Sequence, residues 1–253
     1  MRRVLILALV VLPQRLKHWV ARRLLGWDIH PTAYIGRSII DARYVRMGPE
    51  SMIGPFNVIR ALDRLELARG ANIASRNWIV GIPLDSAIYA QATQRDPSLI
   101  MGEYAMVTVG HDIDCADRVE LAEHAVIAGF RSSVLTHSLN FVNDRFFTGT
   151  VTLGPYAVLL SNCVLLTGTN IPARSIVSAG SVVATPLTTE QTLYRGNPAE
   201  AVRELPDNLR FFRREGRQAQ MADEVARWVG IAEDQRRGGV GRLRTGLASL
   251  FRS

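Results

Sequence analysis

The sequence predicts an all-β solenoid, a parallel β-helix built from a six-residue repeat. Aliphatic residues recur six positions apart over long stretches, and a small residue follows four positions after most of them. An amphipathic helix has a period of 3.6 residues and a half-buried strand a period of 2, so neither produces this spacing. A β-helix does, because each step is one short strand plus one corner, and three steps close a coil.

The longest run of the repeat lies between residues 153 and 183. Its aliphatic positions are Leu153, Leu159, Leu165, Ile171, Val177 and Val183, and its small positions are Ala157, Cys163, Thr169, Ser175 and Ser181. Shorter runs are Ile29/Ile35, Met47/Ile53/Ile59/Leu65, Leu67/Ile73/Ile79, Met101/Val107/Ile113 and Leu121/Ile127. Because each coil buries its aliphatic side chains against its neighbours, we expect residues 29–202 to form one array.

Residues 1–28 are predicted to be helical. The nine aliphatic residues 4–12 are too few for a membrane-spanning helix, which needs about 20, and no signal-peptide cleavage site follows them. Leu16, Trp19, Val20 and Leu24 then recur at helical spacing among arginines, and Gly26 is a plausible stop. Two hypotheses remain open. The segment lies on a membrane surface, or it caps the end of the β-helix.

The repeat is interrupted twice by polar stretches, near residues 83–98 and 139–152, which we interpret as loops that leave the solenoid. After residue 202 the pattern becomes helical, with Leu209, Phe212, Val225 and Trp228 in a charged setting. We therefore expect a helical segment over residues 203–237. Residues 238–253 form a basic tail, predicted as an interfacial helix or a disordered end.

Two motifs carry a resemblance to a known family. The stretch VSAGSVV at residues 177–183 and the stretch RGNPAEAV at residues 195–202 are similar to the closing coil and following segment of sugar and polysaccharide O-acetyltransferases. These enzymes are hexapeptide-repeat acyltransferases. The resemblance implies a left-handed β-helix, a homotrimer, and transfer of an acyl group, acetyl first of all, from acyl-CoA to a hydroxyl of a sugar, polysaccharide precursor or glycolipid.

Such a transfer needs a base for the hydroxyl proton, and a neutral imidazole has a suitable pKa. His137 precedes the second loop, and the segment Thr136-His137-Ser138 resembles the catalytic histidine segment of the family. We predict His137 as the general base, assisted by His111, with Asp114 or Asp112 orienting an imidazole. Candidate ligands for the acceptor hydroxyls are Asn140 and Asn143.

By position within the matched motifs, Ser161, Ala179 and Gly180 resemble residues that meet the pantetheine arm of the donor, and Arg203 resembles a basic residue near its phosphates. The chain departs from the family where Thr-Lys often follows the closing valines, since it has Ala184-Thr185 instead. That departure removes one phosphate partner and leaves Arg195, Arg203 or the basic tail to supply the charge.

The sequence leaves two alternatives to acyl transfer, the first of which is a metal site. His111, His124 and His137 are spaced 13 residues apart, and gamma-class carbonic anhydrases hold zinc on a similar solenoid. Those enzymes have two histidines five residues apart, a spacing that this chain lacks, so we expect no metal. The other alternative is a trimeric scaffold, without enzymatic activity, at a membrane surface.

The net charge of +7 is confined to the two ends of the chain. Residues 1–27 hold six basic residues and no acidic one, residues 203–253 hold 11 arginines and 7 acidic residues, and residues 28–202 hold 13 arginines and 16 acidic residues. This distribution argues against a nucleic-acid-binding body and favours attraction of the ends to anionic lipid or CoA phosphates. With two cysteines and no disulfide framework, we expect a cytoplasmic protein that could lie at the inner face of the cell membrane.

Overall fold

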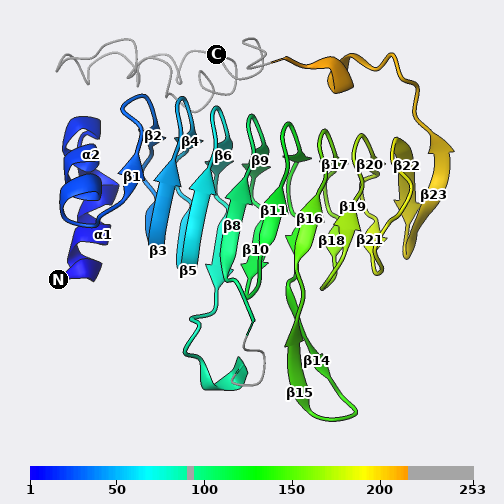
Figure 1. The fold of residues 1–253 in the computed structure, drawn as a ribbon, viewed down its shortest axis with the longest axis horizontal. Helices are drawn as coiled ribbons and strands as arrows, with labels where there is room; N and C mark the ends of the chain where they lie inside the picture. Colours follow the sequence, from blue (N-terminus) through cyan, green and yellow to red (C-terminus); the bar gives the residue numbers. More distant parts are fainter. Residues whose placement is uncertain (90–93, 216–253) are drawn as a thin grey trace, which may run out of the picture. The chain divides into compact units, whose positions relative to one another are not determined.

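The computed structural model describes residues 1–89 and 94–215, and residues 28–196 form a stack of coils (Figure 1). Each coil passes through three faces, and the strands of each face pair in parallel with those of the coils before and after. The first face holds β2 (Tyr34–Ile35), β4 (Met52–Ile53), β6 (Asn72–Ser75), β9 (Met106–Val109), β12 (Val126–Ile127), β17 (Val158–Leu159), β20 (Ile176–Val177) and β22 (Thr192–Gly196).

The other two faces belong to one continuous sheet. The second face holds β7 (Trp78–Gly81), β10 (Asp112–Cys115), β13 (Ser133–Val134), β18 (Val164–Leu165) and β21 (Val182–Val183). The third holds β1 (Asp28–Ile29), β8 (Ser98–Met101), β11 (Val119–Leu121), β16 (Val151–Leu153) and β19 (Asn170–Ile171). The long strands β3 (Ile39–Met47) and β5 (Val58–Leu67) run across both faces, so that β5 pairs with β7 at its start and with β8 at its end.

The interior of the coils is filled by the aliphatic residues of the repeat. Every aliphatic position that the six-residue spacing predicts is buried, and the least buried of them, Ile29, is 3% exposed. In-register pairing places equivalent residues on top of one another, as in Leu159 over Val177 and Leu165 over Val183. The period of six is therefore the period of the core.

Two helices, α1 (Arg2–Val11) and α2 (Gln14–Arg23), pack against the first coils. Their inner faces bury Ile6, Leu9, Val20 and Ala21, and the core at this end continues into Trp27. The N-terminal segment thus caps the solenoid, as one of the two hypotheses expected. Within the described residues, neither helix is long and apolar enough to cross a membrane.

A ladder of buried side chains runs along the first corner, between the first and second faces. Its rungs are Ser38, Asn57, Asn77, His111, Ser132 and Cys163, all 2% exposed or less. The backbone N–H of each rung after the first donates to the side chain of the rung one coil earlier, at 2.8–3.2 Å. The ladder satisfies backbone donors at a corner where the parallel strands stop.

Two insertions leave the solenoid at the second corner, between the second and third faces, and project from the same side of the stack (Figure 1). The first connects β7 to β8 and contains the short helix η1 (Ala87–Tyr89). The second is a hairpin of β14 (His137–Asn140) and β15 (Arg145–Thr148). The structure differs here from the predicted loop over 139–152, because antiparallel pairing begins two residues earlier, at His137.

The chain after the last coil also differs from expectation. β23 (Ala199–Glu204) is a strand antiparallel to β22, and η2 (Arg210–Arg213) is a single 3₁₀ turn. The predicted helical segment over 203–237 therefore begins with strand and turn, since the Asn197-Pro198 turn folds the chain back along β22. The rest of that segment and the tail 238–253 lie outside the described residues.

We predict that the Asn77→Ala substitution destabilises the protein by about 3 kcal/mol, because it leaves buried groups without partners. The Asn77 amide accepts from the His111 N–H and donates to Asn57 Oδ1 and to the Thr108 carbonyl. The measurement is urea unfolding of the variant and of Asn208→Ala, which removes the same amide from an exposed position. Equal stability of the two variants would contradict a structural role for the ladder.

Candidate functional site

The candidate site lies at the second corner, where His137 meets Asp114. The Nδ1 atom of His137, the first residue of β14, is 2.7 Å from Oδ2 of Asp114 in β10. The His137 side chain is 33% exposed, and its Nε2 atom has no hydrogen-bond partner in residues 1–89 and 94–215. One ring nitrogen is therefore fixed by a carboxylate, while the other faces outward.

Asp114 is held by its own set of donors. Its Oδ2 atom accepts from the Thr136 N–H at 2.8 Å, and its Oδ1 atom accepts from the Ala116 N–H at 3.1 Å. Burial alone raises the pKa of the Asp114 carboxyl, but hydrogen bonds from His137 and Thr136 outweigh burial and hold that pKa below its usual value. The carboxylate is thus ionised and oriented at neutral pH.

The same contact acts on the imidazole in the opposite sense. The hydrogen bond to Asp114 raises the pKa of His137 above its usual value, and this effect is larger than the lowering by burial. An anionic acceptor at Nδ1 places the neutral ring's proton on that nitrogen, so the lone pair lies on the outward Nε2. This is the tautomer that a general base requires.

Each insertion contributes an aromatic ring to the site. Tyr89, from η1, packs edge-on against the His137 ring, with centroids 6.0 Å apart. The ring centroid of Phe146, from β15, lies 5.5 Å from that of Tyr89 and 6.5 Å from that of His137. The histidine is therefore flanked by two insertions that leave the solenoid two coils apart.

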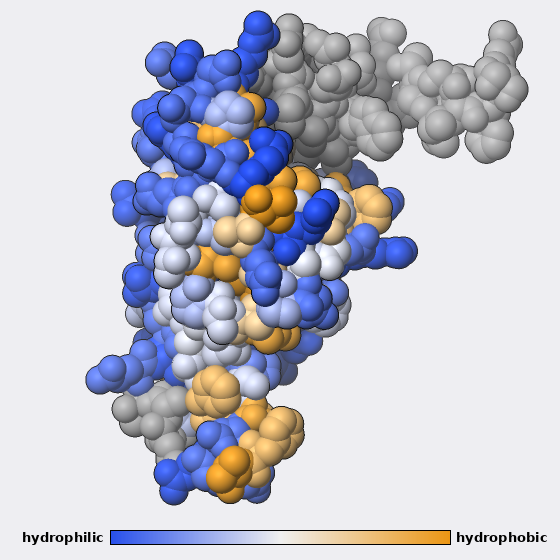
Figure 2. Space-filling model, turned by 90° about the vertical axis from the view of Figure 1, so that its right-hand side faces the viewer, coloured by the Kyte–Doolittle hydropathy of each residue, from blue (hydrophilic) through white to orange (hydrophobic). Residues whose placement is uncertain are grey.

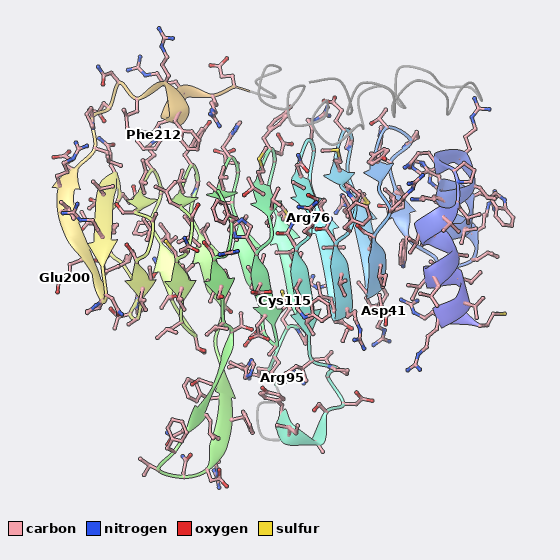
Figure 3. All side chains as sticks on the ribbon, turned by 180° about the vertical axis from the view of Figure 1, so that it is seen from behind. Asp41, Arg76, Arg95, Cys115, Glu200 and Phe212 are labelled. Atoms are coloured by element: carbon pink, nitrogen blue, oxygen red, sulfur yellow. The ribbon has the colours of Figure 1, made fainter. Side chains whose placement is uncertain are left out.

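The intervening coil, which carries Asp114, anchors the first insertion. The guanidinium of Arg95 donates to the carbonyls of Ile82, Pro83 and Ala116 and lies 4.6 Å from the centroid of the Tyr89 ring. Figure 3 shows Arg95 at the root of this insertion, beyond Cys115. Arg95 is 7% exposed, and its contacts with these carbonyls and with the Tyr89 ring hold Tyr89 in position.

A carboxylate of the same coil ties the two insertions together. Asp117 accepts from the Thr148 hydroxyl at 2.8 Å and from the Asp96 N–H at 3.1 Å. Asp96 in turn pairs with Arg64 at 2.7 Å and with Arg118 at 2.8 Å. The tight corner of one coil thus fixes the loop before it and the hairpin after it.

His111 does not join this site. It is fully buried as a rung of the ladder, where its Nδ1 accepts from the Ser132 N–H at 3.2 Å and its Nε2 lies 3.0 Å from the Thr108 hydroxyl. Burial lowers the pKa of His111 to about 4. With both ring nitrogens occupied, His111 has no atom available for a substrate, which does not fit the predicted assisting role.

The three equally spaced histidines occupy three different corners. His111 lies at the first corner and His137 at the second. His124 lies at the third, where its ring is stacked between those of Tyr104 and Tyr156, with ring centroids 5.2 and 4.7 Å away. Within the described residues, no group of three or more His, Cys, Asp or Glu side chains could hold a metal ion.

Three of the four predicted donor-binding residues lie together. Ser161, Ala179 and Gly180 occupy the first corner of two successive coils, and the Gly180 N–H donates to the Ser161 carbonyl at 3.0 Å. Gly180 has a φ of +76° and no atom within 4 Å of the position that a Cβ would take, so this corner is open. Arg195 lies beside this corner, since the N–H of the adjacent Gly196 donates to Ser181.

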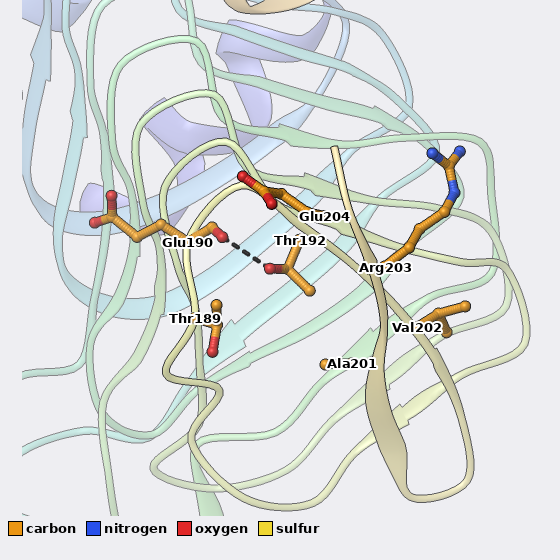
Figure 4. Close-up of a pocket in the computed structure, with 7 residues that line it drawn as sticks. All are labelled: Thr189, Glu190, Thr192, Ala201, Val202, Arg203 and Glu204. Carbon is orange, nitrogen blue, oxygen red and sulfur yellow. Dashed lines mark hydrogen bonds between the residues drawn. The ribbon is translucent and has the colours of Figure 1, made fainter. Parts of the chain in front are cut away.

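Arg203 lies elsewhere. It is near the far end of β23, where it pairs with Leu193, whereas Ala199 at the start of β23 pairs with Gly196. There it lines a surface hollow of about 470 Å³ whose walls also include Glu190 and Glu204 (Figure 4). The structure therefore does not unite Arg203 with the other donor-binding candidates, which lie at the first corner.

The predicted acceptor-binding residues lie at the tip of the hairpin. The Asn140 side chain accepts from the backbone N–H groups of Val142 and Asn143 and so shapes the turn. His137 is at the base of the same strand, three residues or about 10 Å away. Phe141, Val142, Phe146 and Phe147 are exposed on this hairpin (Figure 2).

Four residues of the site are not predicted by the sequence, namely Tyr89, Arg95, Phe146 and Asp117. Their roles depend on which loop residues turn inward, and the six-residue spacing predicts nothing about residues outside the coils. The signal that was available is coarser. Both breaks in the repeat fall between second-face and third-face positions, which places both insertions at one corner.

No family model and no curated protein matches the sequence. The solved structures that match include hexapeptide-repeat acetyltransferases and an N-acyltransferase. One, from Vibrio cholerae and complexed with acetyl coenzyme A, is 18% identical over 81% of this chain and 87% of that chain, with a TM-score of 0.44. The polySia-specific acetyltransferase NeuO is 13% identical over 79% and 97%, with a TM-score of 0.41. A maltose O-acetyltransferase from Clostridium difficile 630 is 12% identical over 81% and 84%, with a TM-score of 0.36.

The low pKa of His111 gives a prediction about acid stability. The histidine of the unfolded chain has a pKa near 6.5 and takes up a proton before the buried ring does, so the folded state loses stability as the pH falls from 6.5 to 4. His111→Asn keeps an amide acceptor on the rung, as at Asn57 and Asn77, but does not titrate. We expect its free energy of unfolding to fall by about 3 kcal/mol less over this range than that of the unaltered protein. Parallel pH profiles for the two would contradict the buried, neutral state of His111.

Proposed function

We propose that the protein is an acyl-CoA-dependent O-acyltransferase, with His137 as the general base. The observation that carries the proposal is the His137–Asp114 contact, in which a half-buried carboxylate holds Nδ1 and leaves Nε2 facing outward between two insertions. This is the arrangement needed to remove a proton from a hydroxyl. Acetyl is the acyl group we expect first.

The reaction would proceed by direct transfer. Nε2 of His137 takes the proton of the acceptor hydroxyl while the hydroxyl oxygen attacks the thioester carbonyl carbon. The imidazolium that forms is stabilised by Asp114, which remains ionised. When the tetrahedral intermediate collapses, the C–S bond breaks and the imidazolium returns the proton to the departing thiolate. The products are an O-acyl ester and a free thiol, and His137 regains its starting state.

The acyl donor would lie along the second face, between the two corners. Ser161, Ala179 and Gly180 line the open first corner, and Arg195 is the guanidinium beside it. We further propose a left-handed winding and a homotrimer, both of which the resemblance to the hexapeptide-repeat acyltransferases implies. The acceptor would be a sugar, polysaccharide precursor or glycolipid hydroxyl, because the exposed ring of Phe146 beside His137 suits the C–H face of a sugar ring.

Replacing His137 tests the assignment. His137→Ala should lower turnover about 10²- to 10⁴-fold, the usual contribution of a general base, and leave acyl-CoA binding nearly unchanged. The readout is release of free thiol from acetyl-CoA over a panel of sugars and sugar nucleotides, with thermal shift as the measure of donor binding. His30→Ala, at a histidine remote from the second corner, is the matched control. Turnover near that of the unaltered protein would exclude His137 as the base, and no shift with any acyl-CoA would favour the scaffold alternative.

Replacing Asp114 tests the pairing. Asp114→Asn removes the negative charge that raises the pKa of His137, so the acidic limb of the kcat/KM profile should move to lower pH. The rate on the plateau should fall about a hundredfold or more, because the imidazolium loses its counter-charge. Asp112→Asn, at an exposed carboxylate two residues earlier on β10, should change neither. An acidic limb that stays in place in Asp114→Asn would show that Asp114 does not act on His137.

A further inference from the structure

The outer face of the N-terminal cap is apolar and exposed. On α1, Val4, Leu7 and Val11 are 69%, 59% and 79% exposed, and their spacing places them on one stripe of the helix. On α2, Leu16 and Trp19 are exposed in the same way, 42% and 54%. Since both helices bury their opposite sides against the coils, both stripes face away from the solenoid, and Figure 3 shows side chains of the cap projecting outward.

Exposed arginines border these stripes. Arg3 flanks the stripe of α1, and Arg15 and Arg23 flank that of α2. The two acidic residues nearest in sequence, Asp28 and Asp41, lie near the guanidiniums of Arg46 and Arg2. Lys17 does not belong to the surface charge, because it is buried, donates to the carbonyls of Ile35 and Gly36, and has a pKa lowered by burial to about 8.

We propose that this outer face, called the cap face, binds the surface of an anionic lipid bilayer. Aliphatic side chains and a tryptophan bordered by arginines match the boundary between acyl chains and anionic headgroups. A second copy of the chain fits less well, because two cap faces would bring arginines against arginines. This proposal is independent of the proposed acyl transfer, because the cap face and the second corner are different parts of the molecule.

The apolar hairpin tip provides a contrast. Phe141 and Val142 are 88% and 97% exposed, more than any large hydrophobic residue of the cap except Met1. Their charged neighbours are one acid and one base, Asp144 and Arg145. Exposure without excess positive charge does not single out an anionic surface, so the hairpin serves as the control patch.

The first test is cosedimentation of the full chain with vesicles. We expect binding to phosphatidylcholine vesicles that contain about 30 mol% phosphatidylglycerol, and loss of most of it when salt is raised from about 0.05 to 0.5 M. Arg3→Gln/Arg15→Gln/Arg23→Gln should weaken the partition constant about a hundredfold. Arg60→Gln/Arg76→Gln/Arg174→Gln makes the same change of charge on exposed coil residues and should leave binding close to that of the unaltered protein.

The second test separates the two apolar patches. Leu7→Ser/Trp19→Ser should lose binding, whereas Phe141→Ser/Val142→Ser should retain it. Bromine-labelled lipid should quench the fluorescence of the unaltered protein more than that of Trp19→Phe. Because the altered side chains are exposed, each variant should unfold at the same temperature as the unaltered chain. The proposal is overturned if the cap variants bind as the unaltered protein does, if the matched controls lose as much, or if the cap face pairs copies of the chain instead of lipid.

Discussion

The fold depends on the stacking of one coil on the next. A single coil is too thin to bury its aliphatic side chains and has no partner for its backbone groups, so both are satisfied only by neighbouring coils. Chain can therefore be added without breaking the stack only where it leaves at a corner and returns to the same corner. Both insertions obey this constraint. The constraint also explains why their roots lie close together, although some fifty residues separate them in the sequence.

The site is a consequence of that arrangement. A rigid corner supplies Asp114 and Asp117, the hairpin supplies His137 and Phe146, and the earlier insertion supplies Tyr89. The polar groups that hold the two insertions are themselves half-buried and hydrogen-bonded, so the imidazole is positioned by the most regular part of the molecule. A side chain that must present one nitrogen and hide the other gains from such a support.

The core could be predicted from the sequence, because the period of six is imposed by the geometry of the coil and each aliphatic position reports it directly. The site could be predicted only in part. His137 and Asp114 lie in or beside the repeat, where spacing has meaning, whereas Tyr89 and Arg95 lie in an insertion with no period. His111 shows a different limit. A histidine beside a glycine and two aspartates has a suggestive sequence setting, yet its place on the interior ladder is defined by Asn77 and Ser132, which are 34 and 21 residues away. Local sequence does not distinguish an imidazole that serves the backbone from one that serves a substrate.

The two ends of the stack are closed by different means. At the start, the helices α1 and α2 cover the first coil. At the finish, β23 turns back antiparallel along β22, exposes Glu200, Arg203 and Glu204, and is followed by Pro206. An unprotected last coil would offer a row of free backbone groups to the first coil of another molecule, and the same pairing that builds the solenoid would then build a fibre. The array has a finite length because both of its ends are protected from such pairing. Helices cover one end, and charged residues, a reversed strand and a proline protect the other.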